Sequence, residues 1–187
     1  MSDAAQQEMV LSSPAFVDGG MMPRAHTCDG ENLSPALHWQ GVPDGTRSLV
    51  LMMEDLDIPT PRLRLFRWTH WLVYDIAPGS SLPEGIPREW QLEGGAKQGL
   101  TSFRRSGYDG PCPLGGAHRY RFHLYALDCT LDLAPEHIRR RDVTHEMEGH
   151  VLAHADLTGV YRRQKRERHS IGTGLRGAEH GTRDGIL

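Results

Sequence analysis

Glycine and proline are spaced so closely in the first part of this chain that they exclude long helices there. The 187 residues include 21 glycines and 12 prolines. Within residues 1–47 these two residue types recur every few positions, often beside aspartate, as in Asp44-Gly45. Because such pairs mark turns, only short strands fit between them, and we expect strands at residues 9–11 and 36–39.

Three later segments have the pattern of core strands. Residues 48–53 form a continuous apolar run, which is typical of a strand buried on both faces. Residues 68–76 are rich in aromatic and β-branched side chains, and residues 120–127 alternate polar with apolar. The connections at residues 77–87 and 94–116 are rich in glycine and proline, and loops of that length are usually functional or disordered.

Helical periodicity starts only after residue 131. Pro135 suits the first turn of a helix, and Gly159 suits its C-cap. Apolar side chains recur between them at helical spacing, at Val143, Met147, Val151 and Leu152. Many short strands and one late helix predict a mainly β fold, a β-sandwich with a C-terminal helix and long loops.

The length of the chain suits one compact domain. We expect a flexible N-terminus over residues 1–8, a single domain over residues 9–162 and a basic, mobile tail over residues 163–187. No apolar run approaches the roughly 20 residues that span a bilayer, and the polar N-terminus lacks the features of a signal peptide. We therefore predict a cytoplasmic protein.

The formal net charge of the chain is −3, which argues against general nucleic-acid binding.

The three cysteines, Cys28, Cys112 and Cys129, are odd in number and widely spaced. They match neither a disulfide framework nor a zinc knuckle, and in the cytoplasm we expect their thiols to be reduced. A reactive thiol at Cys112, in a Gly-Pro-Cys-Pro turn, is a minor alternative.

Histidines near the C-terminus give a weak signal for a metal site. His145 and His150 resemble the zincin pattern H-E-x-x-H with one residue too many, so on a helix they point about 140° apart. His150 and His154 have the i, i+4 spacing that lets two helical side chains share a metal. Exposed histidines explain the pattern better, because no third ligand is evident. We expect neither a metal nor another cofactor.

Alternation along the core strands brings ionisable groups to one end of otherwise apolar faces. A period of two places alternate side chains of each strand on the same face. In the first strand, if it continues past its apolar run, these side chains are Leu49, Leu51, Met53, Asp55 and Asp57. In the other two strands they are Trp68, His70, Leu72 and Tyr74, and His118, Tyr120, Phe122 and Leu124. A buried carboxylate or imidazole is costly unless it is paired. Alone, each group is more simply a satisfied core residue, but the pattern on three strands favours a shared site.

Such a site has the chemistry of an anion pocket. His70 and His118 would hold a phosphate, while Asp55 would set their tautomers or bind an ammonium group. Arg62, Arg64 and Arg67 would either draw anions to the pocket or form a solvated face.

Five segments match the motifs of one known family. They are residues 27–35 (TCDGENLSP), 55–59 (DLDIP), 68–71 (WTHW), 107–113 (GYDGPCP) and 116–120 (GAHRY). On these motifs, which come in the right order over residues 9–162, the chain resembles the phosphatidylethanolamine-binding protein (PEBP) family, in its bacterial and archaeal Raf-kinase-inhibitor-like branch.

The resemblance implies a Greek-key β-sandwich with a small pocket for phosphate, phosphoethanolamine-like head groups or other small anions. By matched position, the pocket residues are Asp55, His70 and His118, with walls from Trp68, Gly110, Pro111 and Tyr120. Supporting residues are Asp57, Pro59, Tyr108 and Arg119. Three residues depart from the family motifs, Leu56, Ile58 and Leu114, and we expect them to alter the pocket.

We therefore expect a regulatory small-anion binding protein that is not an enzyme. The alternative is an inhibitor that docks through exposed loops on a kinase or serine protease, which the resemblance also implies. A hydrolase using Asp55, His70 and His118 is less well supported, because the sequence offers no recognisable nucleophile. The expected partners exclude nucleic acid and stable membrane insertion, and an oligomer is compatible with the sequence.

Overall fold

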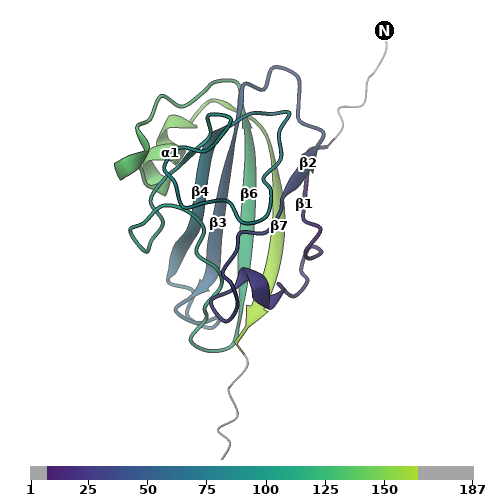
Figure 1. Ribbon diagram of the computed structural model, residues 1–187, viewed down its shortest axis with the longest axis vertical. Helices are drawn as coiled ribbons and strands as arrows, with labels where there is room; N and C mark the ends of the chain where they lie inside the picture. Colours follow the sequence, from purple (N-terminus) through teal and green to yellow (C-terminus); the bar gives the residue numbers. More distant parts are fainter. Residues whose placement is uncertain (1–7, 164–187) are drawn as a thin grey trace, which may run out of the picture.

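The computed structural model describes residues 8–163, which form two antiparallel sheets and little helix (Figure 1). The main sheet has five strands in the order β5-β4-β3-β6-β7. These strands are β3 (Ser48–Ile58), β4 (Phe66–Ile76), β5 (Lys97–Gln98), β6 (Ala117–Leu127) and β7 (Val151–Arg162). The small sheet pairs β1 (Val10–Ser12) with β2 (His38–Gln40). The helices are η1 (Arg24–His26), η2 (Pro135–His137) and α1 (Arg140–Glu146).

These elements confirm the expected mainly β fold. β1 and β2 lie within two residues of the two short strands predicted near the N-terminus, which is the usual uncertainty of strand ends. The expected N-terminal segment 1–8 and tail 163–187 fall outside the described residues, except for Glu8 and Arg163. No helix in the described part of the chain is long and apolar enough to cross a membrane.

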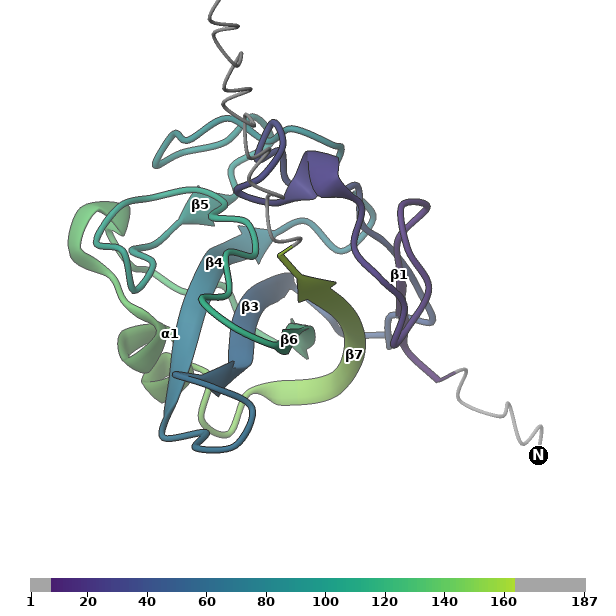
Figure 2. The same cartoon turned by 90° about the horizontal axis from the view of Figure 1, so that it is seen from below.

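The main sheet is covered on both faces (Figure 2). Its inner face carries Leu49, Leu51, Met53, Trp71, Val73, Phe122 and Leu124, and N-terminal residues such as Phe16 and Leu37 pack on it. Its outer face carries Val50, Met52, Leu72 and Tyr74, which pack against Val143 and Met147 from α1 and the residue that follows it. This two-sided burial explains why residues 49–53 are continuously apolar.

β3 continues past its apolar run, so that Asp55 and Asp57 lie within the strand. Asp55 pairs across the sheet with Trp68 on β4 and with Tyr120 on β6. The end of this central strand therefore brings a carboxylate between two neighbouring strands, as the alternation predicts.

A β-bulge in β4 corrects the predicted face of that strand. Met53 pairs with Trp71 and Glu54 pairs with Thr69, which leaves His70 as an extra residue. Because a bulge shifts the alternation by one residue, Trp71 joins the inner face and Leu72 packs on the outer face. The expectation that Trp68 and His70 share a face with Leu72 and Tyr74 was wrong for the last two residues.

The second correction concerns the C-terminal helix, which ends at Glu146. Residues 151–162 form β7 instead, pairing with β6 from Leu127 to Ala117. Gly159 is not a helix cap, because it lies inside β7, where a Cβ atom would lie 2.4 Å from Cγ of Met22. A full-length strand partner outweighs the helical spacing of four apolar residues. His154 consequently lies on a strand, so its i, i+4 spacing from His150 does not place the two side chains on one face of a helix.

The third correction concerns the cysteines. Cys28 and Cys112 form a disulfide with a Cα–Cα distance of 5.4 Å, and Cys129 is free. The disulfide joins the loop around η1 to the segment before β6, where the backbone N–H of Cys28 also donates to the carbonyl of Pro111 (3.1 Å). The prediction of reduced thiols failed because the two cysteines are 84 residues apart in sequence and meet only through the fold.

We expect the double substitution Cys28→Ser and Cys112→Ser to lower the free energy of unfolding by about 4 kcal/mol, because the disulfide closes a long loop in the unfolded chain. Denaturant unfolding of the oxidised protein would measure this loss. Cys129→Ser is the matched control and should cost much less. Equal losses in the two variants would show that the disulfide does not carry this stability.

Candidate functional site

Asp55, His70, His118 and Tyr120 converge where the ends of β3, β4 and β6 meet. All four are at most 3% exposed. The ring of Tyr120 lies edge-on to His70, with centroids 5.2 Å apart, and stacks beside His118 at 6.4 Å. The structure thus gathers the three predicted ionisable groups around one tyrosine.

Asp55 fixes the orientation of His118. Its Oδ2 accepts a hydrogen bond from Nδ1 of His118 (2.8 Å), and its Oδ1 accepts one from the backbone N–H of Asp57 (2.8 Å). Because an ionised carboxylate can only accept, Nδ1 carries the proton. The other ring nitrogen, Nε2, is buried and has no hydrogen-bond partner among residues 8–163.

His70 is held in the same tautomer by a backbone carbonyl. Its Nδ1 donates to the carbonyl oxygen of Asp109 at 2.6 Å. Burial lowers the pKa of His70 below its ordinary value of 6.5, despite the opposing effects of that carbonyl and of the Asp55 charge. His70 is therefore neutral near pH 7, and its Nε2 can only accept a hydrogen bond.

Tyr120 supplies a buried hydroxyl that lies near the Asp55 carboxylate and the backbone of Cys112, but within residues 8–163 it meets the geometry of a hydrogen bond with no group. Burial, and then the charge of Asp55, raise the pKa of Tyr120 well above its ordinary value. The hydroxyl therefore keeps its proton and remains a donor. Together with Nε2 of His118, it forms a pair of unsatisfied polar atoms on one face of β6, and such atoms are uncommon in native interiors.

The segment 108–113 forms a wall that is fixed against the loop after η1. Tyr108 donates its hydroxyl hydrogen to the carbonyl of His26 (2.7 Å), and the backbone N–H of Gly110 donates to Oδ1 of Asn32 (2.7 Å). A Cβ atom at Gly110 would lie 2.5 Å from that carbonyl oxygen, so only glycine fits. The carbonyl of Pro111 accepts the backbone hydrogen bond from Cys28.

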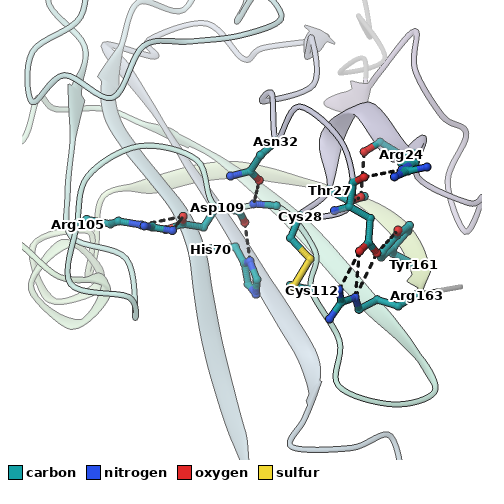
Figure 3. The surroundings of a disulfide bond; sticks show 12 residues. Arg24, Thr27, Cys28, Asn32, His70, Arg105, Asp109, Cys112, Tyr161 and Arg163 are labelled. Carbon is teal, nitrogen blue, oxygen red and sulfur yellow. Dashed lines mark hydrogen bonds and ion pairs between the residues drawn. A yellow bond between two sulfur atoms is a disulfide. The ribbon is translucent and has the colours of Figure 1, made fainter. Parts of the chain in front are cut away.

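Figure 3 shows the disulfide between His70 and Asp109 on one side and Tyr161 and Arg163 on the other. It therefore joins the wall of the site to the rest of the molecule.

Phe103 covers the site beside Trp68. Its ring lies edge-on to both Trp68 (5.5 Å) and His70 (5.4 Å) and is 42% exposed. The sequence patterns did not identify Phe103, Asn32 or Asp109 as part of the site. Asn32 and Asp109 lie within the matched motifs 27–35 and 107–113, which were the only available signals, while Phe103 lies in a loop without periodicity.

Asp57 supports the end of β3 and does not contact the histidines. It accepts hydrogen bonds from Nε (2.9 Å) and Nη2 (2.8 Å) of Arg119, and Nε of Arg64 lies 2.9 Å away. Burial raises the pKa of Asp57, but the hydrogen bonds from Arg119 outweigh it and the net pKa is lowered. Pro59 follows in the exposed turn after the strand.

The arginines near the site and the residues that depart from the family motifs differ in their surroundings. Arg64 is held by Asp57, and Arg67 is paired with the buried Glu54 (3.4 Å), so both are paired with carboxylates. Leu114 is 95% exposed, so this departure from the family motif does not fill the site. Leu56 and Ile58 are half-buried.

We expect Asp57→Asn to lower the free energy of unfolding by about 2 kcal/mol at neutral pH, because it removes the charge that Arg119 pairs with. A carboxyl with a lowered folded pKa stabilises the protein above its unfolded pKa, and this contribution is lost as the pH falls through the folded value. The difference from wild type should therefore shrink below about pH 4 in denaturant unfolding. Asp44→Asn, in an exposed turn, is the control, and an equal loss there would contradict this role.

The chain is similar to known proteins over most of its length. The family model described as phosphatidylethanolamine-binding protein matches residues 12–162. A UPF0098 protein of Methanothermobacter thermautotrophicus is 47% identical over 156 residues, which cover 83% of this chain and 99% of that protein. A UPF0098 protein of Aquifex aeolicus is 40% identical, with 83% and 89% covered.

Two crystal structures are similar in fold and in sequence. A putative phosphatidylethanolamine-binding protein homologue from Chlamydia trachomatis has a TM-score of 0.75 and 38% identity, covering 84% of this chain and 99% of its own. E. coli YbcL, described as a new member of the mammalian PEBP family, has a TM-score of 0.75 and 30% identity with the same coverage. Since a family model spans nearly all described residues and these relatives share the fold, this chain belongs to the phosphatidylethanolamine-binding protein family.

Proposed function

We propose that this protein binds a small anion, phosphate or a phosphoethanolamine-like head group, at the site formed by Asp55, His70, His118 and Tyr120. The observation that carries the proposal is the pair of unsatisfied buried atoms, Nε2 of His118 and the hydroxyl of Tyr120. Leaving such atoms unpaired costs about 1–3 kcal/mol each, and a phosphate oxygen would satisfy both once Nε2 of His118 carries a proton.

Anion binding at this site is coupled to a proton. With Nδ1 of His118 protonated, Nε2 of the neutral ring has only a lone pair and cannot donate to an anion. The ring must therefore gain a second proton, and the adjacent Asp55 stabilises the resulting imidazolium. Phosphate binding should consequently be accompanied by the uptake of a proton, so that it weakens as the pH rises.

His70 favours a ligand that also carries a hydrogen-bond donor. Its lowered pKa and fixed tautomer make Nε2 an acceptor near neutral pH. The P–OH of a monoprotonated phosphate or the ammonium group of phosphoethanolamine would supply that donor. This chemistry supports a head-group-like ligand over a simple halide or a fully deprotonated anion.

We also propose binding without catalysis. Asp55 and His118 form an acid–base pair, but hydrolysis through a covalent step needs a nucleophile beside it. The thiol of Cys112 in the adjacent wall is consumed by the disulfide, and the raised pKa of Tyr120 makes its hydroxyl a poor nucleophile. These features support a binding role.

The cytoplasmic location stays a prediction, and the Cys28–Cys112 disulfide weighs against it because most cytoplasms keep thiols reduced. Alkylation of free thiols in intact cells is the test. Three alkylated cysteines are expected from a reducing cytoplasm, and alkylation of Cys129 alone would contradict that location.

Calorimetric titration with phosphate and with phosphoethanolamine, at about pH 6 and about pH 8, tests the proposed site. We expect tighter binding at the lower pH, no measurable binding by His118→Ala, and roughly tenfold weaker binding by Tyr120→Phe, which loses only the hydroxyl. Tighter binding of phosphoethanolamine than of phosphate would identify the head group as the preferred ligand.

His154→Ala, an exposed histidine on β7, is the control and should bind like wild type. Absence of binding by the wild type at millimolar ligand would contradict the proposal. The function would then be sought in direct docking on a kinase or protease.

A further inference from the structure

Three potential metal ligands lie together at the end of β6 that is opposite the anion site. They are Asp128, Cys129 and His150, and their ligand atoms all lie within 4.8 Å of one another. His118 and Asp128 are separated by the length of β6, roughly 33 Å at the usual rise of a strand. The cluster is therefore separate from the proposed anion pocket and independent of it.

The backbone around the cluster is held by specific hydrogen bonds. The N–H of Asp128 donates to the carbonyl of His150 (3.1 Å), and the hydroxyl of Ser48 donates to the carbonyl of Cys129 (2.6 Å). Gly149, with a φ of +82°, allows the chain to reverse between α1 and β7 and so places His150 beside the end of β6. The two segments that supply the ligands are thus fixed relative to each other.

The side chains are placed where an ion from solvent can reach them. Asp128 and His150 are exposed, and their Oδ1 and Nδ1 atoms are 2.7 Å apart. Cys129 is half-buried and packs against the outer-face core, which restrains the direction of its side chain. Because Cys28 and Cys112 are joined, Cys129 is the only free thiol of the protein.

We propose that Asp128, Cys129 and His150 bind a divalent first-row transition-metal ion of the zinc type. Thiolate, imidazole and carboxylate are the donors that Zn²⁺ and Co²⁺ accept, whereas Mg²⁺ and Ca²⁺ prefer all-oxygen sites. Three protein ligands leave a coordination position for water or an external ligand. The sequence showed no ligand spacing because Asp128-Cys129 and His150 come from separate segments.

Metal binding here should stabilise the folded protein, because the ion would join the end of β6 to the start of β7 only in the native state. We expect the midpoint of thermal unfolding to rise on addition of Zn²⁺. The same addition should slow the alkylation of Cys129.

Cobalt chloride titration of the full-length protein, with its disulfide intact, tests the site directly. Thiolate bound to Co²⁺ gives a near-ultraviolet charge-transfer absorption, and only Cys129 is free to produce it. We expect this absorption to saturate at one equivalent and to disappear on addition of Zn²⁺. Cys129→Ser should abolish the absorption, and Asp128→Asn and His150→Ala should each weaken cobalt binding at least about tenfold.

His154→Ala is the matched control and should bind cobalt like wild type. All substituted positions except Cys129 are exposed, and circular dichroism of each metal-free variant would check its fold. No absorption from wild type at about millimolar cobalt, or absorption that persists unchanged in Asp128→Asn and His150→Ala, would overturn the proposal.

Discussion

β3 is hydrogen-bonded along both edges, to β4 and β6, and is covered by apolar residues on both faces. Apart from the half-buried Leu56 and Ile58, its side chains are buried, so every buried polar group it carries must be satisfied by protein or by a ligand. β3 nevertheless ends in Asp55 and Asp57, which are both about 1% exposed. The arrangement of the site follows from how the neighbouring strands satisfy these two carboxylates.

The two carboxylates are satisfied in different ways, and this separates support from ligand binding. Asp57 is saturated by Arg119 and Arg64, which brace the turn between β3 and β4. Asp55 is paired with Nδ1 of His118. The other ring nitrogen, Nε2, then has no hydrogen-bond partner among the described residues and lies on the same side of β6 as the hydroxyl of Tyr120. A buried ion pair with one unpaired nitrogen lowers the stability of a purely structural core. The same nitrogen can bind an anion when a proton is taken up with it.

The walls of the site depend on contacts between segments that are distant in sequence. Gly110 packs against the loop after η1 so closely that no side chain fits, and the disulfide joins the same two segments. The bulge at His70 turns that imidazole toward Tyr120. Rigid walls of this kind hold the polar groups in place before a ligand binds, which lowers the ordering cost of binding.

By itself, the sequence determined the mainly β fold and the site residues of β6, because residues 119–124 alternate polar with apolar and the strand has no bulge there. The matched motifs also identified the family. Only the tertiary structure decided that residues 151–162 are a strand, that His70 sits at a bulge, that Cys28 meets Cys112, and that His150 meets Asp128 and Cys129. These features depend on pairing between segments far apart in the chain, and local patterns of hydrophobicity carry no information about which distant partner a segment will meet.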